Sequence, residues 1–429
     1  MKIEEKLKIN IYPSELEIQK DNNEKIILKI TENFTNDSKP EKIYENLLAQ
    51  NAPVQSILEK NKDQLISSLN KLISASTINP NKEFHLEKTF QCHDLPISKI
   101  YFNHKGNSFI TCSYDGDAIL WDRKTGTTKY KIKYHANTIN SALFSHDDNL
   151  LLTGSFDNLC MLFDANNGIR IKTFEGHDGE IVEINFDKEE KYFCTASMDL
   201  TSKIFDIEQG KDILTLKGHD DVVFKALFNN ESNMILTGSY DKTCKIFDAK
   251  NGNILFDFKE HKKEISNCFF NPKDNNIIIT NSLDGLCKIY DIRNGENSLQ
   301  TFDDHSQKEI LCSDISSNGK YLITGGGDKL INMYDIEKME KIQTFEGHEK
   351  EIYSLHFNYG NDIKKILSGD GLGQCRLWDI NNGECTQIID SSEETEIISC
   401  IFNEKNSDIL IADVDNIVKL YTNEIPVNF

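Results

Sequence analysis

The sequence predicts a mainly β protein in which a four-stranded unit repeats about every 42 residues after a small N-terminal α+β module. Three observations lead to this fold class. Seven histidines recur at spacings of 42 to 44 residues. An aspartate follows most of them 22 or 23 residues later, and an aromatic residue lies six positions beyond that aspartate. Short segments rich in β-branched and aromatic residues, bounded by Gly, Asn or Asp, fill the intervals, as expected for strands and turns.

Composition and charge narrow the classes of partner. The chain has 429 residues and a net charge of −21, of which residues 84–429 carry −20. An acidic surface repels phosphate backbones and anionic headgroups, so we expect basic protein partners, no nucleic acid and no direct membrane insertion. The N-terminal stretch lacks the apolar region of a secretory signal, and no apolar run approaches the ~20 residues of a membrane span.

The eleven cysteines indicate a reduced, cytosolic protein. The sequence contains no C-x-x-C pair, which argues against zinc sites, and an odd number argues against a complete disulfide framework. Four cysteines recur three residues before the repeated aromatic position, which predicts small buried strand residues: Cys160, Cys244, Cys287 and Cys375. We therefore expect neither a metal site nor a cofactor.

Residues 1–83 predict a module of a different kind. The segments KINIY, LEIQK and KIILKI read as two or three strands. Ser38 and Glu41 have capping-box spacing and predict the start of a helix, and Pro53 predicts the start of a second one. We expect the apolar face of this module to pack on the repeat domain or to dock a partner.

The repeat domain is predicted over residues 84–422, followed by a tail over 423–429. The recurring residues are the histidines His93, His135, His177, His219, His261, His305 and His348, the serines Ser113, Ser155, Ser197, Ser239 and Ser282, the aspartates Asp115, Asp157, Asp199, Asp241, Asp284 and Asp328, and the tryptophans Trp121 and Trp378. The seventh unit has Leu372 where the turn aspartate is expected, and the weaker eighth unit has Glu393 in place of histidine. Ser, His and Asp can form a catalytic triad, but a triad occurs once per active site. Their repetition predicts an architectural role.

The period and its GH and WD marks resemble the WD-repeat family over about residues 84–422. This resemblance implies a β-propeller in which the matching His, Ser, Asp and Trp side chains form a buried hydrogen-bond network in each blade. Phe163, Phe205 and Phe247 replace Trp and remove its N–H donor. We expect eight blades, because the last unit lacks an outer strand that residues 84–90 can supply. Seven blades remain the alternative if residues 390–422 pack otherwise.

A narrower resemblance is to the family of dynein assembly factors with WD repeats. It rests on Tyr12-Pro13 and on the motifs GHDGEI at 176, EHKKEI at 260 and GHEKEI at 347. The resemblance implies a non-enzymatic adaptor that links outer-arm dynein cargo to a subunit of intraflagellar transport complex B. It also implies a location in the cytoplasm and in the cilium or flagellum, including the basal body region. We expect the chain to be a monomer.

Two other functional classes would require motifs that the sequence does not contain. A ubiquitin-ligase substrate receptor would carry an F-box helix with a Leu-Pro start before the blades, and the predicted helices show no such start. A hydrolase would need one polar cluster that departs from the repeat. The segments GGGDK at 325 and GDGLG at 369 lack the spacing and context of phosphate-binding loops.

Two sets of residues predict a protein-contact face around the mouth of the ring. Three residues after each histidine, or four in the sixth unit, the units carry Pro96, Thr138, Glu180, Val222, Glu264, Glu309, Glu351 and Glu396. Immediately before the turn aspartate, the first four units carry Tyr114, Phe156, Met198 and Tyr240. Exposed aromatic side chains are typical binding hot spots, and an acidic arc attracts basic segments. Solvated glutamates and locally packed aromatic residues are the simpler interpretation of the same pattern.

Overall fold

The computed structural model describes residues 8–12, 15–19, 25–29, 83–91, 93–360, 363–390 and 395–423. The chain divides into two compact units, one of residues 84–422 and one of residues 1–83 with 423–429. In the smaller unit, β1 (Lys8–Tyr12), β2 (Glu15–Gln19) and β3 (Lys25–Lys29) form an antiparallel sheet in the order β1-β2-β3. The strands predicted near the N-terminus are thus confirmed. The two helices predicted from Ser38 and Pro53 lie outside the described residues.

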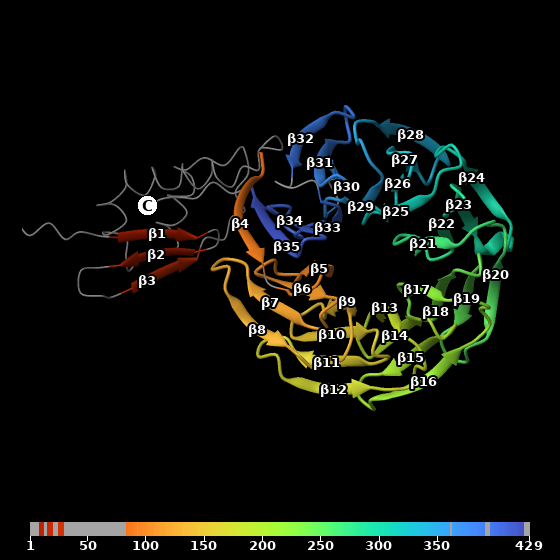
Figure 1. The fold of residues 1–429 in the computed structure, drawn as a ribbon, viewed down its shortest axis with the longest axis horizontal. Helices are drawn as coiled ribbons and strands as arrows, with labels where there is room; N and C mark the ends of the chain where they lie inside the picture. Colours follow the sequence, from red (N-terminus) through yellow and green to blue (C-terminus); the bar gives the residue numbers. More distant parts are fainter. Residues whose placement is uncertain are drawn as a thin grey trace, which may run out of the picture. The chain divides into compact units, whose positions relative to one another are not determined.

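The larger unit consists of eight four-stranded antiparallel sheets arranged around a ring, as Figure 1 shows. Blades one to four contain β5 (Ile97–Phe102), β6 (Ser108–Ser113), β7 (Ala118–Asp122), β8 (Thr128–Ile132); β9 (Ile139–Phe144), β10 (Leu150–Ser155), β11 (Cys160–Asp164), β12 (Arg170–Phe174); β13 (Ile181–Phe186), β14 (Tyr192–Ser197), β15 (Ser202–Asp206), β16 (Lys211–Leu216); β17 (Val223–Phe228), β18 (Met234–Ser239), β19 (Cys244–Asp248) and β20 (Ile254–Phe258).

Blades five to eight continue the pattern. They contain β21 (Ile265–Phe270), β22 (Ile277–Ser282), β23 (Cys287–Asp291), β24 (Ser298–Phe302); β25 (Ile310–Ile315), β26 (Tyr321–Gly326), β27 (Ile331–Asp335), β28 (Glu340–Phe345); β29 (Ile352–Phe357), β30 (Lys365–Asp370), β31 (Gln374–Asp379), β32 (Cys385–Asp390); β33 (Ile397–Phe402), β34 (Asp408–Asp413), β35 (Ile417–Thr422) and β4 (His85–Gln91). A short 3-10 helix, η2 (Ile292–Asn294), follows β23.

The ring is closed by the strand that comes first in the larger unit. β4 pairs antiparallel with β35, from Ile417 opposite Gln91 to Thr422 opposite His85, and Figure 1 shows the two strands side by side. This pairing confirms the predicted eight blades and the predicted role of residues 84–90. It also removes the unpaired edge that β35 would otherwise present.

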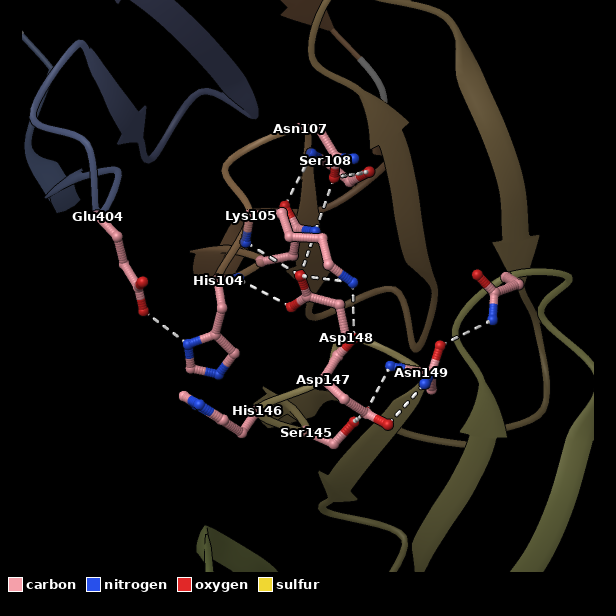
Figure 2. Close-up of polar contacts among 12 residues, drawn as sticks. His104, Lys105, Asn107, Ser108, Ser145, His146, Asp147, Asp148, Asn149 and Glu404 are labelled. Atoms are coloured by element: carbon pink, nitrogen blue, oxygen red, sulfur yellow. Dashed lines mark hydrogen bonds and ion pairs between the residues drawn. The ribbon is translucent and has the colours of Figure 1, made fainter. Parts of the chain in front are cut away.

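Polar side chains reinforce the contacts of blade one with both of its neighbours, blade eight and blade two. Arg123 donates from Nε to Asp408 at 2.9 Å, and its guanidinium also lies 2.9 Å from Glu87. His104 Nδ1 lies 2.6 Å from Glu404 Oε1 (Figure 2). Figure 2 also shows Asp148 of blade two accepting hydrogen bonds from backbone N–H groups of blade one, those of His104 and Lys105, at 2.8 and 3.0 Å.

The hydrophobic core lies between neighbouring blades. One cluster combines Leu152, Cys160, Leu162 and Phe174 of blade two with Ile181, Ile184, Phe193 and Phe205 of blade three. Another joins Phe90 and Leu420 of blade eight to Phe109 and Trp121 of blade one, so the closing strand contributes to the core as well as to the ladder. The four cysteines predicted as buried strand residues are buried, as expected.

Candidate functional site

A histidine, an aspartate and a threonine form a hydrogen-bonded group in each of the first six blades. In blades one to six the histidine Nδ1 lies 2.5 to 3.0 Å from the aspartate carboxylate, and Nε2 lies 2.6 to 2.8 Å from the threonine Oγ1. The threonines are Thr111, Thr153, Thr195, Thr237, Thr280 and Thr324. Because a neutral imidazole has one donor and one acceptor nitrogen, this arrangement uses both.

The serine predicted to share this network has a different role, which corrects the sequence interpretation. In blade four, Ser239 Oγ accepts from the Asp241 N–H at 3.0 Å and donates to the Asp221 carbonyl at 3.0 Å. Ser239 forms no hydrogen bond with His219, whose Nε2 bonds Thr237 instead. The other four predicted serines make the same pair of contacts. The threonine also recurs, two residues before each serine, so its period could have identified it.

The aromatic position joins the network only where it is tryptophan. Trp121 Nε1 donates to Thr111 Oγ1 at 3.2 Å, and Trp378 Nε1 donates to Ser368 Oγ at 2.8 Å. In the described part of the chain, the buried hydroxyls of Tyr290 and Tyr334 have no hydrogen-bond partner. Four-membered networks therefore occur in blades one and seven.

Blade seven retains its aspartate, contrary to the assignment of that position to Leu372. Asp370 lies 2.8 Å from His348 Nδ1, and Ser368 takes the place of threonine, 2.6 Å from Nε2. Asp370 stands at the end of its strand, 22 residues after His348, which is the usual spacing, whereas counting six residues back from Trp378 selects Leu372. In blade eight, Asp413 accepts from two backbone N–H groups at 3.1 Å but is hydrogen-bonded by no histidine in the residues that the structure describes. Glu393 lies outside the described residues.

The electrostatics of the carboxylates differ with their histidine partner. Burial alone would raise the pKa of Asp284, but hydrogen bonds from His261 and from the Lys262 N–H lower it to about 2. Burial raises the pKa of Asp413, which has no such partner, above its ordinary value. Burial lowers the pKa values of His93 and His348 below 6.5. Histidines that are neutral and bonded at both nitrogens have no free nitrogen for general base catalysis, so the network holds turns to loops.

The two predicted contact sets lie next to each other on one face of the ring. In every blade, a backbone hydrogen bond joins one residue of each set. The N–H at the position before the turn donates to the carbonyl of the residue three or four positions after the histidine, at 2.9 to 3.1 Å. These pairs are Tyr114 with Pro96, Phe156 with Thr138, Met198 with Glu180, Tyr240 with Val222, Leu283 with Glu264, Gly327 with Glu309, Gly371 with Glu351, and Val414 with Glu396. We call this surface the turn face.

The large apolar side chains of the turn face are concentrated in blades one to four. Tyr114, Met198 and Tyr240 are 47%, 39% and 38% exposed, and Phe156 is half-buried. The ring of Tyr240 stacks on Phe224 with centroids 5.7 Å apart. In the other four blades, the equivalent residues are the smaller Leu283, Gly327, Gly371 and Val414, so the large apolar side chains at this position are confined to blades one to four.

The glutamates of the turn face lie mainly in blades five to eight, and one of them is neutralised by a lysine. Glu309 forms an ion pair with Lys263 at 3.2 Å. In the described residues, Glu180, Glu264, Glu351 and Glu396 form no ion pair, which leaves their charges available to a partner. Tyr353, which is 40% exposed and which the sequence patterns did not identify, lies near two of them: partial burial and the carboxylates of Glu396 and Glu351 raise its pKa.

Two other kinds of feature are absent from the described residues. Among them, no cluster of three His, Cys, Asp or Glu side chains has the arrangement of a metal site. In the same part of the chain, no helix has the length and apolar character of a membrane span.

Comparisons with known proteins are in keeping with this geometry. The WD40 family, described as "WD domain, G-beta repeat", matches residues 84–122, 126–164, 168–206, 210–248, 252–291, 296–335 and 339–379. Each matched segment spans the outer strand of one blade and the first three strands of the next, which is the offset that closes the ring. A solved structure of the computationally designed Ika8 protein superposes with a TM-score of 0.69 at 23% identity, covering 78% of this chain and 98% of that one.

Individual relatives match over short stretches. The chain is 30% identical over 112 residues to the U3 small nucleolar RNA-associated protein 15 homolog of Xenopus tropicalis, covering 26% of this chain and 21% of the relative. It is 36% identical over 59 residues to Dynein assembly factor with WD repeat domains 1 of Xenopus laevis, 14% of each. It is 29% identical over 102 residues to Cell division control protein 4 of Saccharomyces cerevisiae, covering 24% of this chain and 12% of the relative. The matched stretch thus covers about a fifth of the length of the first relative and a smaller share of the other two.

Proposed function

This chain belongs to the WD40 family of repeat proteins, and from that premise we propose that it is a non-enzymatic adaptor that binds protein partners on its turn face. The observation that carries the proposal is the pairing of the two contact sets in all eight blades, which supports one continuous surface. Exposed Tyr114, Met198 and Tyr240 provide the large side chains that contribute most to protein interfaces. The occupied nitrogens of the histidines support an architectural role for the polar network.

The chemistry of the turn face indicates the kind of segment it binds. The apolar half, in blades one to four, fits apolar anchors of a partner. The unpaired carboxylates of Glu264, Glu351 and Glu396, of which the last two lie near Tyr353, fit lysine or arginine side chains. We infer that a partner segment lies across the mouth of the ring, with its basic end toward blades five to eight.

For the cellular role, we propose transport of outer-arm dynein in cilia or flagella, with a subunit of intraflagellar transport complex B as the second partner. The 59-residue similarity to Dynein assembly factor with WD repeat domains 1 supports this choice, as do the GHxxEI motifs. The cytoplasm and the cilium, including the basal body region, are the locations that this role requires, and a monomer suffices for it. A substrate receptor of a ubiquitin ligase is the alternative.

Affinity purification of the tagged full chain from ciliated cells tests both levels. Two variants change the turn face: Glu264→Lys with Glu351→Lys and Glu396→Lys, and Tyr114→Ala with Tyr240→Ala. A charge-matched control changes Glu189, Glu337 and Glu384 to Lys, because these residues lie in the turns between first and second or third and fourth strands, on the other face.

We expect the wild-type protein and the control to recover the same partners and both face variants to lose them. Recovery of dynein chains with transport subunits supports the proposed cellular role. Recovery of a cullin instead would favour the substrate receptor of a ubiquitin ligase. If both face variants retain every partner, the turn face is not the binding surface.

A further inference from the structure

The inner strands of the eight blades enclose a cavity of about 360 Å³ at the centre of the ring. Each inner strand has a β-bulge near its start, and the residue after the bulge lines this cavity. We call these eight residues the channel ring: Lys99, Ser141, Glu183, Lys225, Asn267, Cys312, Ser354 and Ser399. The volume of the cavity is in the range of small-molecule sites.

One positive charge of the channel ring has no counter-charge. Glu183 Oε1 lies 2.6 Å from Lys225 Nζ, so these two residues of blades three and four neutralise each other. Beyond the ring, His356 and Asp314 form a second pair at 3.7 Å. In the residues that the structure describes, the Lys99 ammonium forms neither a hydrogen bond nor an ion pair. An uncompensated cation thus stands at the centre of a protein with a net charge of −21.

The residues at the ring position on either side of Lys99 are polar and uncharged. Ser141 and Ser399 occupy the same ring position in the neighbouring blades two and eight, and Tyr101 follows on the same side of its strand. The Lys99 side chain is exposed to the solvent of the channel, while the surrounding protein lowers its pKa and Glu183 counteracts the effect. Across the ring, the Ser266 hydroxyl is buried in the channel wall without a hydrogen-bond partner in the described chain. Unpaired buried polar groups are costly, and a bound ligand is one way to satisfy them.

We propose that the channel binds a small soluble anion bearing carboxylate or phosphate groups, held by Lys99 with the hydroxyls of Ser141 and Ser399. The ammonium supplies the charge and three donors, and the hydroxyls supply further donors to the remaining oxygens. None of Lys99, Ser141 and Ser399 belongs to the turn face, although Tyr353, which stands beside Glu351 and Glu396, also lines the cavity.

Calorimetric titration of the full chain with citrate and with pyrophosphate tests this site and distinguishes the two anion chemistries. We expect at least one of them to bind the wild-type protein saturably. Lys99→Met should weaken binding about tenfold or more, the effect of losing a charge-assisted hydrogen bond. Glu183→Gln should strengthen it several-fold, because it releases Lys225 from its ion pair.

Lys105→Met is the matched control, since Lys105 is exposed in the turn that follows the strand of Lys99, outside the channel. Thermal melting confirms folding, and the anion should raise the melting temperature of the wild-type protein but not of the Lys99→Met protein. The proposal is overturned if neither anion binds the wild-type protein saturably. It is equally overturned if the Lys99 variant binds as tightly as the Lys105 variant.

Discussion

At the scale of single residues, the histidine network shows both the strength and the limit of periodicity. The period identified each histidine and six aspartates, because they recur at nearly constant spacing. It assigned the partner of His219 to Ser239 rather than Thr237, because both residues recur and spacing does not tell which hydroxyl faces the imidazole. It also missed Asp370, although this residue follows His348 by the usual 22 residues, because counting six residues back from Trp378 gives Leu372 instead.

Replacement of Thr237 by Val tests the corrected network. Valine keeps the shape but leaves His219 Nε2 without a partner in a buried site, at a cost of about 1–3 kcal/mol. The same substitution at exposed Thr128 should change the free energy of unfolding by less than about 0.5 kcal/mol. Urea unfolding of the two variants decides the matter, and equal midpoints would show that the threonine does not contribute.

Replacement of Tyr334 by Phe should have the opposite sign. The Tyr334 hydroxyl is buried without a partner in the described chain, and Thr324 nearby is bonded to His305. Because the unpaired hydroxyl loses its hydration on folding, we expect its removal to leave stability unchanged or to increase it by up to about 1 kcal/mol. A lower urea midpoint for the Phe variant would indicate a hydrogen bond that the structure lacks.

Acid should destabilise the ring in two stages. The folded pKa values of His93 and His348 lie below 6.5 because of burial, so these residues stabilise the fold fully above pH 6.5 and lose that contribution as pH falls. The folded pKa of Asp284, about 2, lies below its ordinary 3.8, so its contribution is complete above about pH 4 and is lost toward pH 2. Asp413 acts in the opposite direction because its pKa is raised. We expect a constant urea midpoint at pH 7–8 that declines below pH 6.5, and a midpoint that rises from pH 7 to 5 would disprove this account.

At the scale of strands, closure could be predicted and the bulges could not. The last unit is one strand short, and FHLEKTF at 84–90 has the pattern of an outer strand, so sequence alone paired β4 with the last blade. The bulge at the start of each inner strand is defined by which residues pair across the sheet, and the sequence does not show this pairing. Because every blade contains the same bulge, the repeat length carries no sign of it. For this reason the channel ring and its unpaired Lys99 were not visible in the sequence.

Two truncations test the closure. Deletion of residues 1–83 should leave a soluble ring because β4 remains, whereas deletion of residues 1–92 exposes the edge of β35 and should cause aggregation. Both proteins lack residues 1–83, so a difference between them reports on residues 84–92, which contain β4. Size-exclusion chromatography with light scattering measures it, and equal solubility would mean that closure by β4 is dispensable.

At the scale of the whole molecule, the fold class followed from the repeat, but the partner did not. Eight units, a closing strand and the position of the turn face all follow from residues that recur. Specificity depends on residues that differ between blades, such as Tyr114, Tyr240 and Tyr353. Because these residues do not recur, periodicity cannot show which of them contact a partner. The electrostatic division of the turn face required the structure, because Lys263 neutralises one of the predicted glutamates.

The most direct test of the adaptor proposal is hydrogen–deuterium exchange of the full chain, alone and bound to a partner that it recovers from cells. We expect the partner to slow exchange in the turns that carry Tyr114, Phe156, Met198 and Tyr240 and in the loops that carry Glu264, Glu351 and Glu396. Exchange in the outer strands β12, β16 and β20 should not change. Protection confined to those outer strands, or to the opposite turns that contain Glu189 and Glu337, would contradict the assignment of the turn face as the binding surface.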